Sequence, residues 1–229
     1  MKHIFALLTL SLLGSASVAQ TKTQLKLYQN TDFFNVNYYN GVIQESRSTT
    51  HASINRFSLA VNLIGKKKLS QEIELFIPEI STSIYHVKFP QTYTFNESNT
   101  YDRKISTYAF RYEVNMALHQ SDRSLVSLGA AINPYYWEEK DTPLVSNVYA
   151  RDLKTYGVSL NLIPRVSLKL TRKITLDVNI PFKLYDLQKV TQNIKNPAIP
   201  IADQTNGGYT NIFFQNSYTI RLGIAYALK

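Results

Sequence analysis

The chain has 229 residues, no cysteine, and 25 basic against 16 acidic side chains, which gives a formal net charge of +9. The lack of cysteine excludes a fold held together by disulfide bonds. The basic residues are scattered among expected turns and strands, and the longest run is Lys66-Lys67-Lys68, so the charge does not indicate nucleic-acid binding. The length suits one large all-β domain.

Residues 1–19 have the organisation of a secretory signal peptide. A basic residue near the start is followed by an apolar run over residues 4–13 and by the small residues 17–19. The apolar run is too short to span a membrane as a helix. We expect cleavage after residue 19, so that residues 20–229 form the mature domain.

Apolar residues then recur at every second position in several segments, which is the period of a β-strand. We expect a first strand that starts near Leu25 or Phe33, and further strands over 54–64, 70–85, 105–118, 124–137, 155–170, 174–187 and 213–229. Pro78 is expected to mark a bulge or a strand end, because proline cannot donate to the strand ladder. Short polar turns over 65–68, 119–123 and 171–173 alternate with longer polar loops up to residue 52 and over 88–104, 138–152 and 188–211.

The alternation is clearest from Tyr156 to Leu170 and from Ile174 to Leu187, where each segment has one apolar and one polar face. At about 3.3 Å per residue and a tilt of about 45°, the first segment rises roughly 33 Å, which matches a hydrocarbon layer with its interfaces. The sequence therefore predicts an all-β fold: a closed antiparallel up-and-down transmembrane β-barrel of about eight strands, with both termini periplasmic. A count of ten strands stays open.

Aromatic residues gather at the strand ends nearest the long loops. Strand propensity alone would spread them along the strands. A ring of aromatic side chains at one level is typical of the interfacial girdle of a membrane barrel. We therefore predict an outer aromatic girdle formed by Tyr38, Tyr85, Tyr108, Phe110, Tyr136, Trp137, Tyr156, Phe182 and Phe214.

The polar face of the strands carries charges of both signs. If the apolar face meets lipid, these charges line the lumen. An eight-stranded barrel is just wide enough to be filled by side chains, and buried charges must be paired. We predict a salt-bridged lumen without an open pore, built from Arg56, Glu72, Glu74, Arg111, Glu113, Arg165, Lys169, Asp177, Lys183 and Arg221.

The strand rhythm and amphipathic pattern resemble the small eight-stranded outer-membrane proteins of the OmpA/OmpX type and, more loosely, the short β-barrels exported by Bacteroidota. The resemblance covers nearly the whole mature chain and implies a location in the outer membrane of a Gram-negative bacterium. In that class the last strand is a signal for the assembly machinery and usually ends in an aromatic residue. Here the chain ends Tyr226-Ala227-Leu228-Lys229, so the alternation agrees and the terminal residue differs.

Some barrels of this class modify lipid A with histidine, serine and an acidic residue near the outer surface. His51 and Ser53 lie in the first long loop and His86 lies near the second, but no acidic residue with the required geometry can be assigned to them. We therefore expect no catalytic residues, no cofactor and no metal site.

The leading prediction is a non-enzymatic integral outer-membrane β-barrel that acts as a structural or interaction subunit, including within a larger secretion, uptake or assembly complex. Its expected partners are outer-membrane lipid and lipopolysaccharide, together with other outer-membrane complex subunits, and not nucleic acid. Two alternatives stay open. One is a lipid A-modifying barrel enzyme, an acyltransferase or a deacylase, and the other is a soluble periplasmic lipocalin-like barrel whose apolar face points inward around a ligand.

Overall fold

The computed structural model describes residues 22–38, 48–65, 68–86, 99–144, 149–214 and 217–228. The predicted signal peptide lies outside these ranges, and its cleavage stays a prediction. No helix within the described ranges is long and apolar enough to cross a membrane.

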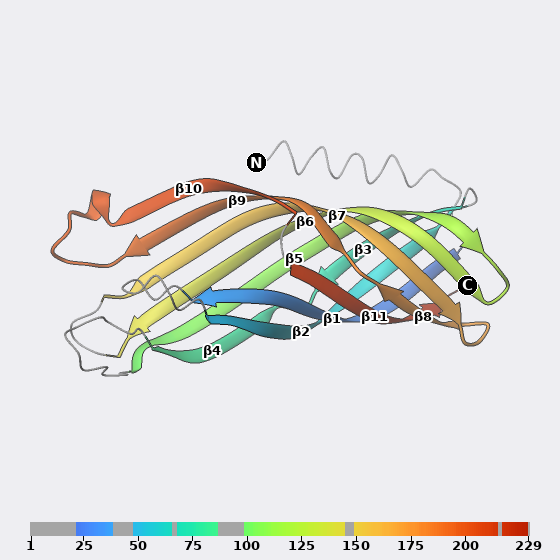
Figure 1. Cartoon of the computed structure of the whole chain (residues 1–229), viewed down its shortest axis with the longest axis horizontal. Coiled ribbons are helices and arrows are strands. Elements are labelled where there is room, and N and C mark those ends of the chain that lie inside the picture. The colour runs from blue at the N-terminus through green and yellow to red at the C-terminus, as the bar shows by residue number, and fades with distance from the viewer. Residues whose placement is uncertain are drawn as a thin grey trace.

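The described residues form one sheet of antiparallel strands (Figure 1). The strands are β1 (Lys22–Tyr38), β2 (Ser48–Ile64), β3 (Leu69–Phe76), β4 (Glu79–His86), β5 (Asn99–Gln120), β6 (Ser124–Pro143), β7 (Arg151–Lys169), β8 (Ile174–Asn179), β9 (Phe182–Ile194), β10 (Thr205–Phe213) and β11 (Ser217–Ala227), and a short 3₁₀ helix, η1 (Ile201–Asp203), lies between β9 and β10.

The sheet closes on itself because β1 pairs with β2 on one side and with β11 on the other. Leu25, for example, lies opposite Val61 of β2 and opposite Tyr226 of β11. Three of the barrel strands are interrupted: β3 and β4 both pair with β5, β8 and β9 both pair with β7, and β10 continues into β11. The predicted closed antiparallel barrel of about eight strands is confirmed.

Two of the interruptions fall at prolines. Pro78 separates β3 from β4, and Pro181 separates β8 from β9. A proline has no N–H for the ladder, so the strand breaks where it occurs. The first of these breaks was expected at Pro78, whereas residues 174–187 were expected to form one unbroken strand. The pairing of β9 with β7 also shifts register between Leu160 and Asn161. After Lys183, the side chains of β9 therefore point to the face opposite to the one that the alternation before the shift predicts.

The strands are longer than the alternation predicts at the end of the barrel that carries the long connections. β6 and β7 extend into the expected loop 138–152, and β9 and β10 extend into the expected loop 188–211. Most side chains in these extensions are polar on both faces, with Val190, Ile194 and Tyr209 as exceptions. Sequence alternation therefore gives no signal there, although the backbone ladder continues.

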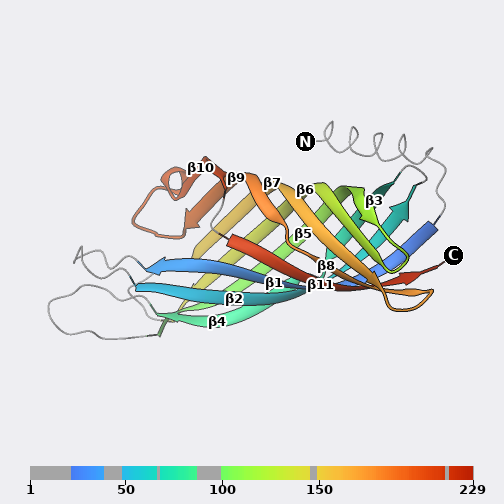
Figure 2. The same ribbon diagram turned by 45° about the vertical axis from the view of Figure 1, so that its right-hand side comes forward.

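The wall has an apolar outer face and a polar inner face. In β7 the burial of the side chains alternates from Thr155 to Leu168, with serine, asparagine and arginine buried and leucine and valine exposed. Exposed apolar residues recur around the barrel, for example Leu59, Leu75 and Ile224. Figure 2 shows the tilted strands that carry this outer face. β1 begins and β11 ends at the end of the barrel that carries the short turns (Figure 1).

A tyrosine packed over a glycine supports the seam between β1 and β11. Tyr28 lies directly opposite Gly223 and is fully buried in the lumen. A Cβ added at Gly223 would lie 2.3 Å from Cδ1 of Tyr28, so no larger residue fits without moving the ring. Tyr135 and Gly157 repeat this arrangement between β6 and β7. In both pairs the missing side chain of the glycine makes room for the tyrosine ring.

We predict that Gly223→Ala lowers the free energy of unfolding by about 1–3 kcal/mol, the cost of overpacking a filled interior. Gly208→Ala in β10 is the matched control, because no heavy atom lies within 4 Å of an added Cβ there. Urea unfolding of both variants in detergent micelles measures the difference. Equal stability of the two variants would show that Tyr28 does not depend on the space at Gly223.

Candidate functional site

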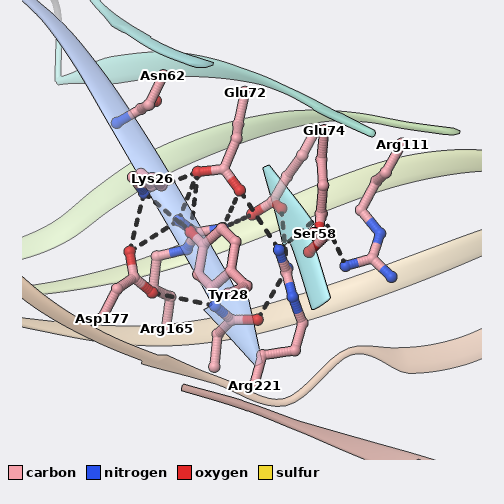
Figure 3. Close-up of polar contacts among 12 residues, drawn as sticks. Lys26, Tyr28, Ser58, Asn62, Glu72, Glu74, Arg111, Arg165, Asp177 and Arg221 are labelled. Atoms are coloured by element: carbon pink, nitrogen blue, oxygen red, sulfur yellow. Dashed lines mark hydrogen bonds and ion pairs between the residues drawn. The ribbon is translucent and has the colours of Figure 1, made fainter. Parts of the chain in front are cut away.

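A network of buried charges crosses the middle of the lumen, and Arg165 of β7 is one of its two centres (Figure 3). Its guanidinium lies 2.8 Å from Glu72 of β3, 2.7 Å from Glu113 of β5 and 2.9 Å from Asp177 of β8. Each distance joins a guanidinium nitrogen to a carboxylate oxygen. One side chain thus connects its own strand, β7, to β3, β5 and β8.

Arg221 of β11 is the second centre. Its guanidinium donates to Glu74 at 2.6 Å and to the side-chain oxygens of Asn30 and Asn179 at 3.0 Å each. The Cζ atom of Arg221 lies 4.0 Å from the centroid of the Tyr28 ring, so the cation also stacks on an aromatic face. Arg221 is fully buried, and its ring and polar contacts together replace its hydration.

Lys26 and Arg111 are the other two buried cations among the described residues. Lys26 Nζ lies 2.7 Å from Glu72 and 2.8 Å from Asp177, while Arg111 lies 3.3 Å from Glu74. Ser58 donates a further hydrogen bond to Glu74. Lys26 and Tyr28 were not predicted as lumen residues. Both could have been found from the strand parity of Leu25 and Leu27, which places the residues between and after them on the opposite face.

The charges of this central network are balanced. We define it as the cations Lys26, Arg111, Arg165 and Arg221, the anions Glu72, Glu74, Glu113 and Asp177, and Tyr28. Every one of these side chains is buried. A buried charge without a partner is very costly, whereas four cations against four anions leave no excess charge among these eight residues. The network therefore fills the lumen with side chains whose charges are stabilised in the interior only by one another.

Three predicted lumen residues lie outside the central network. Arg56 pairs with Asp32 and is only partly buried. Lys183 pairs with Asp186 at 3.1 Å. Lys169 is exposed at the last position of β7 and has no ion pair with a described residue. Its parity points inward, but it lies at the mouth of the barrel, where water solvates the ammonium group.

A second polar group lies between the central network and the long connections. Tyr135 of β6 donates to both carboxylate oxygens of Asp186, at 2.9 and 3.1 Å, and Gln188 donates to the same carboxylate at 3.0 Å. Asp186 is fully buried and also receives the ammonium of Lys183. The polar filling of the lumen thus extends above the central network.

Part of the predicted girdle forms a ladder of rings on the outer wall. Tyr108, Tyr136 and Tyr156 lie on β5, β6 and β7, with ring centroids 6.2 Å apart for the first pair and 4.8 Å apart for the second. Phe182 and Phe214 are exposed and Phe110 is half-buried. The side chains of Tyr38 and Tyr85 lie outside the described residues.

The prediction that Trp137 joins this girdle is wrong. Trp137 lies opposite Thr107 and Thr155, and Thr155 is buried on the lumen side. Residues directly opposite in an antiparallel pair share a face, so Trp137 points into the lumen. Its neighbour Tyr136 is in the outer ladder, and consecutive residues of a strand cannot share a face.

The histidines and the serine considered for lipid A chemistry lie on two strands. His51 and Ser53 lie in β2 and His86 lies in β4, but their side chains are outside the described part of the structure. Within the described ranges, no group of three or more histidine, cysteine, aspartate or glutamate side chains could hold a metal ion.

No family model and no curated protein matches the chain. Solved structures do match its fold. OprG, an outer membrane protein of Pseudomonas aeruginosa, has 14% identity and a TM-score of 0.52 over 91% of this chain and 97% of that one. OmpT, an outer membrane protease of Escherichia coli, has 8% identity and a TM-score of 0.51 over 93% and 98%.

A major outer membrane protein of Thermus thermophilus has 12% identity and a TM-score of 0.50 over 89% of this chain and 99% of that one. At these identities the similarity establishes the fold alone. The chain has the fold of outer-membrane β-barrels, which confirms the predicted resemblance at the level of architecture.

We predict that Arg165→Gln destabilises the barrel by about 3–5 kcal/mol, because three carboxylates lose a buried cation. Lys169→Gln, four residues further along the same strand, should change stability by less than about 0.5 kcal/mol, since this side chain is exposed. Equilibrium unfolding in detergent measures both variants. Addition of Glu113→Gln to Arg165→Gln should restore part of the loss, and a strictly additive double variant would contradict the pairing.

Proposed function

We propose that the chain is an integral barrel of the outer membrane of a Gram-negative bacterium, with a closed lumen, and that it acts as a structural or interaction subunit. The observation that carries this proposal is the central network, whose four cations and four anions are buried across the lumen. A barrel of this size filled by paired charges has no path for a hydrated solute. The barrel then interacts with other molecules through its outer wall and its connections.

The direction of the side chains supports a membrane location. Leucine, isoleucine and valine cover the outside, while asparagine, glutamate and arginine are buried inside. A soluble lipocalin-like barrel needs the opposite arrangement, with its apolar face around the ligand. The tyrosine ladder of β5, β6 and β7 supports the same conclusion, because aromatic rings favour the interface between lipid and water.

The orientation in the membrane and the partners extend this proposal. We place the short turns and both ends of the barrel in the periplasm, and the long connections at the cell surface, as in the class of barrels that the sequence resembles. Lipid and lipopolysaccharide then contact the outer wall, and other outer-membrane subunits bind the connections. The enzyme alternative depends on His51 and Ser53, and no contact within the described residues favours it.

Single-channel recording in planar bilayers tests the closed lumen. We expect no stable conductance from the wild-type protein, because the central network occupies the lumen. The double variant Arg165→Ala/Glu113→Ala removes one cation and one anion, which keeps the charge balanced, and should admit small ions. Leu222→Ala on the exposed outer face is the control and should stay closed. Steady conductance steps from the wild-type protein would refute the closed lumen.

A further inference from the structure

Lysines cluster on the outer wall around the tyrosine ladder: one of them, Lys189, lies directly opposite Tyr156 of the ladder, and three more lie beyond it towards the long connections. Lys104 lies on β5, Lys140 on β6, Lys154 on β7 and Lys189 on β9. Their outward direction follows from their neighbours, since Glu139 next to Lys140 is buried in the lumen. In the same way Thr155 and Asp186, which flank this level on β7 and β9, are buried. We call the four residues the lysine face.

The contacts of the lysine face leave positive charge unmatched. Lys104 and Lys140 lie directly opposite each other, and like charges at such a pair repel. Glu138 is shared between Lys140, at 3.4 Å, and Lys154, at 3.7 Å. Lys189 lies over the ring of Tyr209, at 5.8 Å from its centroid, and has no carboxylate partner among the described residues.

The surrounding charges do not cancel this excess. Lys195 forms an ion pair with Asp152, with 3.1 Å between Nζ and Oδ2. Asp102 is exposed on the same face of β5 but makes no ion pair with a described lysine. Among the described outward residues of β5, β6, β7, β9 and the connection between β9 and β10, five lysines stand against Asp102, Glu138, Asp152 and Asp203, an excess of one positive charge (5 − 4). An anionic partner would relieve the repulsion between Lys104 and Lys140.

The shape of the lysine face indicates which anion fits it. The face spans three strand spacings from β5 to β9, or about 14 Å at 4.8 Å per spacing. It lies on the wall beside and beyond rings that favour the lipid interface, so its ligand lies at the headgroup level of a lipid. A disaccharide with a phosphate at each end presents two anionic groups at such a separation, whereas a phospholipid presents one.

We propose that the lysine face binds the two phosphates of a bisphosphorylated glycolipid of the lipid A type. Lys104 and Lys140 hold one phosphate between them, and Lys154 and Lys189 face the other, through charge-assisted hydrogen bonds. The tyrosine ladder lies beside the first sugar and the upper part of the acyl chains. This inference rests on the proposed outer-membrane location, and it adds the site and the chemical class of the lipid.

Native mass spectrometry of the full chain in detergent micelles tests the proposal. The probes are bisphosphorylated lipid A, monophosphorylated lipid A and phosphatidylglycerol. The variant Lys104→Gln/Lys140→Gln removes the repelling pair, and Lys169→Gln/Arg172→Gln removes the same charge from exposed positions at the opposite end. We expect the wild-type protein to prefer bisphosphorylated lipid A. The first variant should bind it at least tenfold more weakly, and the second should match the wild type.

Two results would overturn the proposal: equal loss in both variants, which indicates general attraction to basic protein, or binding of phosphatidylglycerol as tight as that of bisphosphorylated lipid A through the same lysines. Heat-modifiable gel migration checks that each variant is folded, and Lys189→Gln offers a milder change at the other end of the face. A protein that needs no detergent would refute the outer-membrane location itself. A protein that inserts in bilayers but does not distinguish the lipids would refute only this inference.

Discussion

The pairing of buried charge across the lumen is the constraint on which the rest of this barrel depends. Ionised side chains inside a narrow cylinder persist only when each has partners from other strands. Arg165 and Arg221 meet this requirement by connecting β3, β5, β7, β8 and β11. The strand order that closes the barrel and the network that fills it are therefore mutually dependent, because a slip of register by one residue would turn the charges to the outer face.

The outer surface carries a different kind of side chain at each level. Leucine and isoleucine cover the middle of the wall, the rings of Tyr108, Tyr136 and Tyr156 lie above them, and lysines follow. This sequence of apolar, aromatic and charged groups mirrors hydrocarbon, interface and headgroup. The same alternation of the strands produces both faces, so a filled lumen and an apolar outer wall are two results of one sequence pattern.

Much of this could be predicted from the sequence, because the direction of a strand side chain follows from its parity. Parity places Glu72 and Arg165 inside, and an apolar run such as Val158, Leu160 and Leu162 outside. The predictions that were wrong or incomplete concern side-chain direction, members of the network and strand length. Trp137 was assigned to the girdle with its neighbour Tyr136, although consecutive residues of a strand point to opposite faces. The phase change after Lys183 arises from the pairing of β9 with β7, which no local pattern reveals. Lys26 was missed because the alternation in the first strand is short, and the length of β6 was missed because its far end is polar on both faces.

The most direct test of the central claim is the solvent contact of a single outward position. The absence of cysteine allows one fluorescent label at Leu160→Cys in the middle of the wall, and a reference label at Ser121→Cys in an exposed turn. In phospholipid vesicles, the account predicts that bromine on the acyl chains quenches the Leu160 label and aqueous iodide does not, while the Ser121 label behaves in the opposite way. Quenching of the Leu160 label by iodide alone would contradict a barrel whose apolar face meets lipid and whose charges are sealed inside.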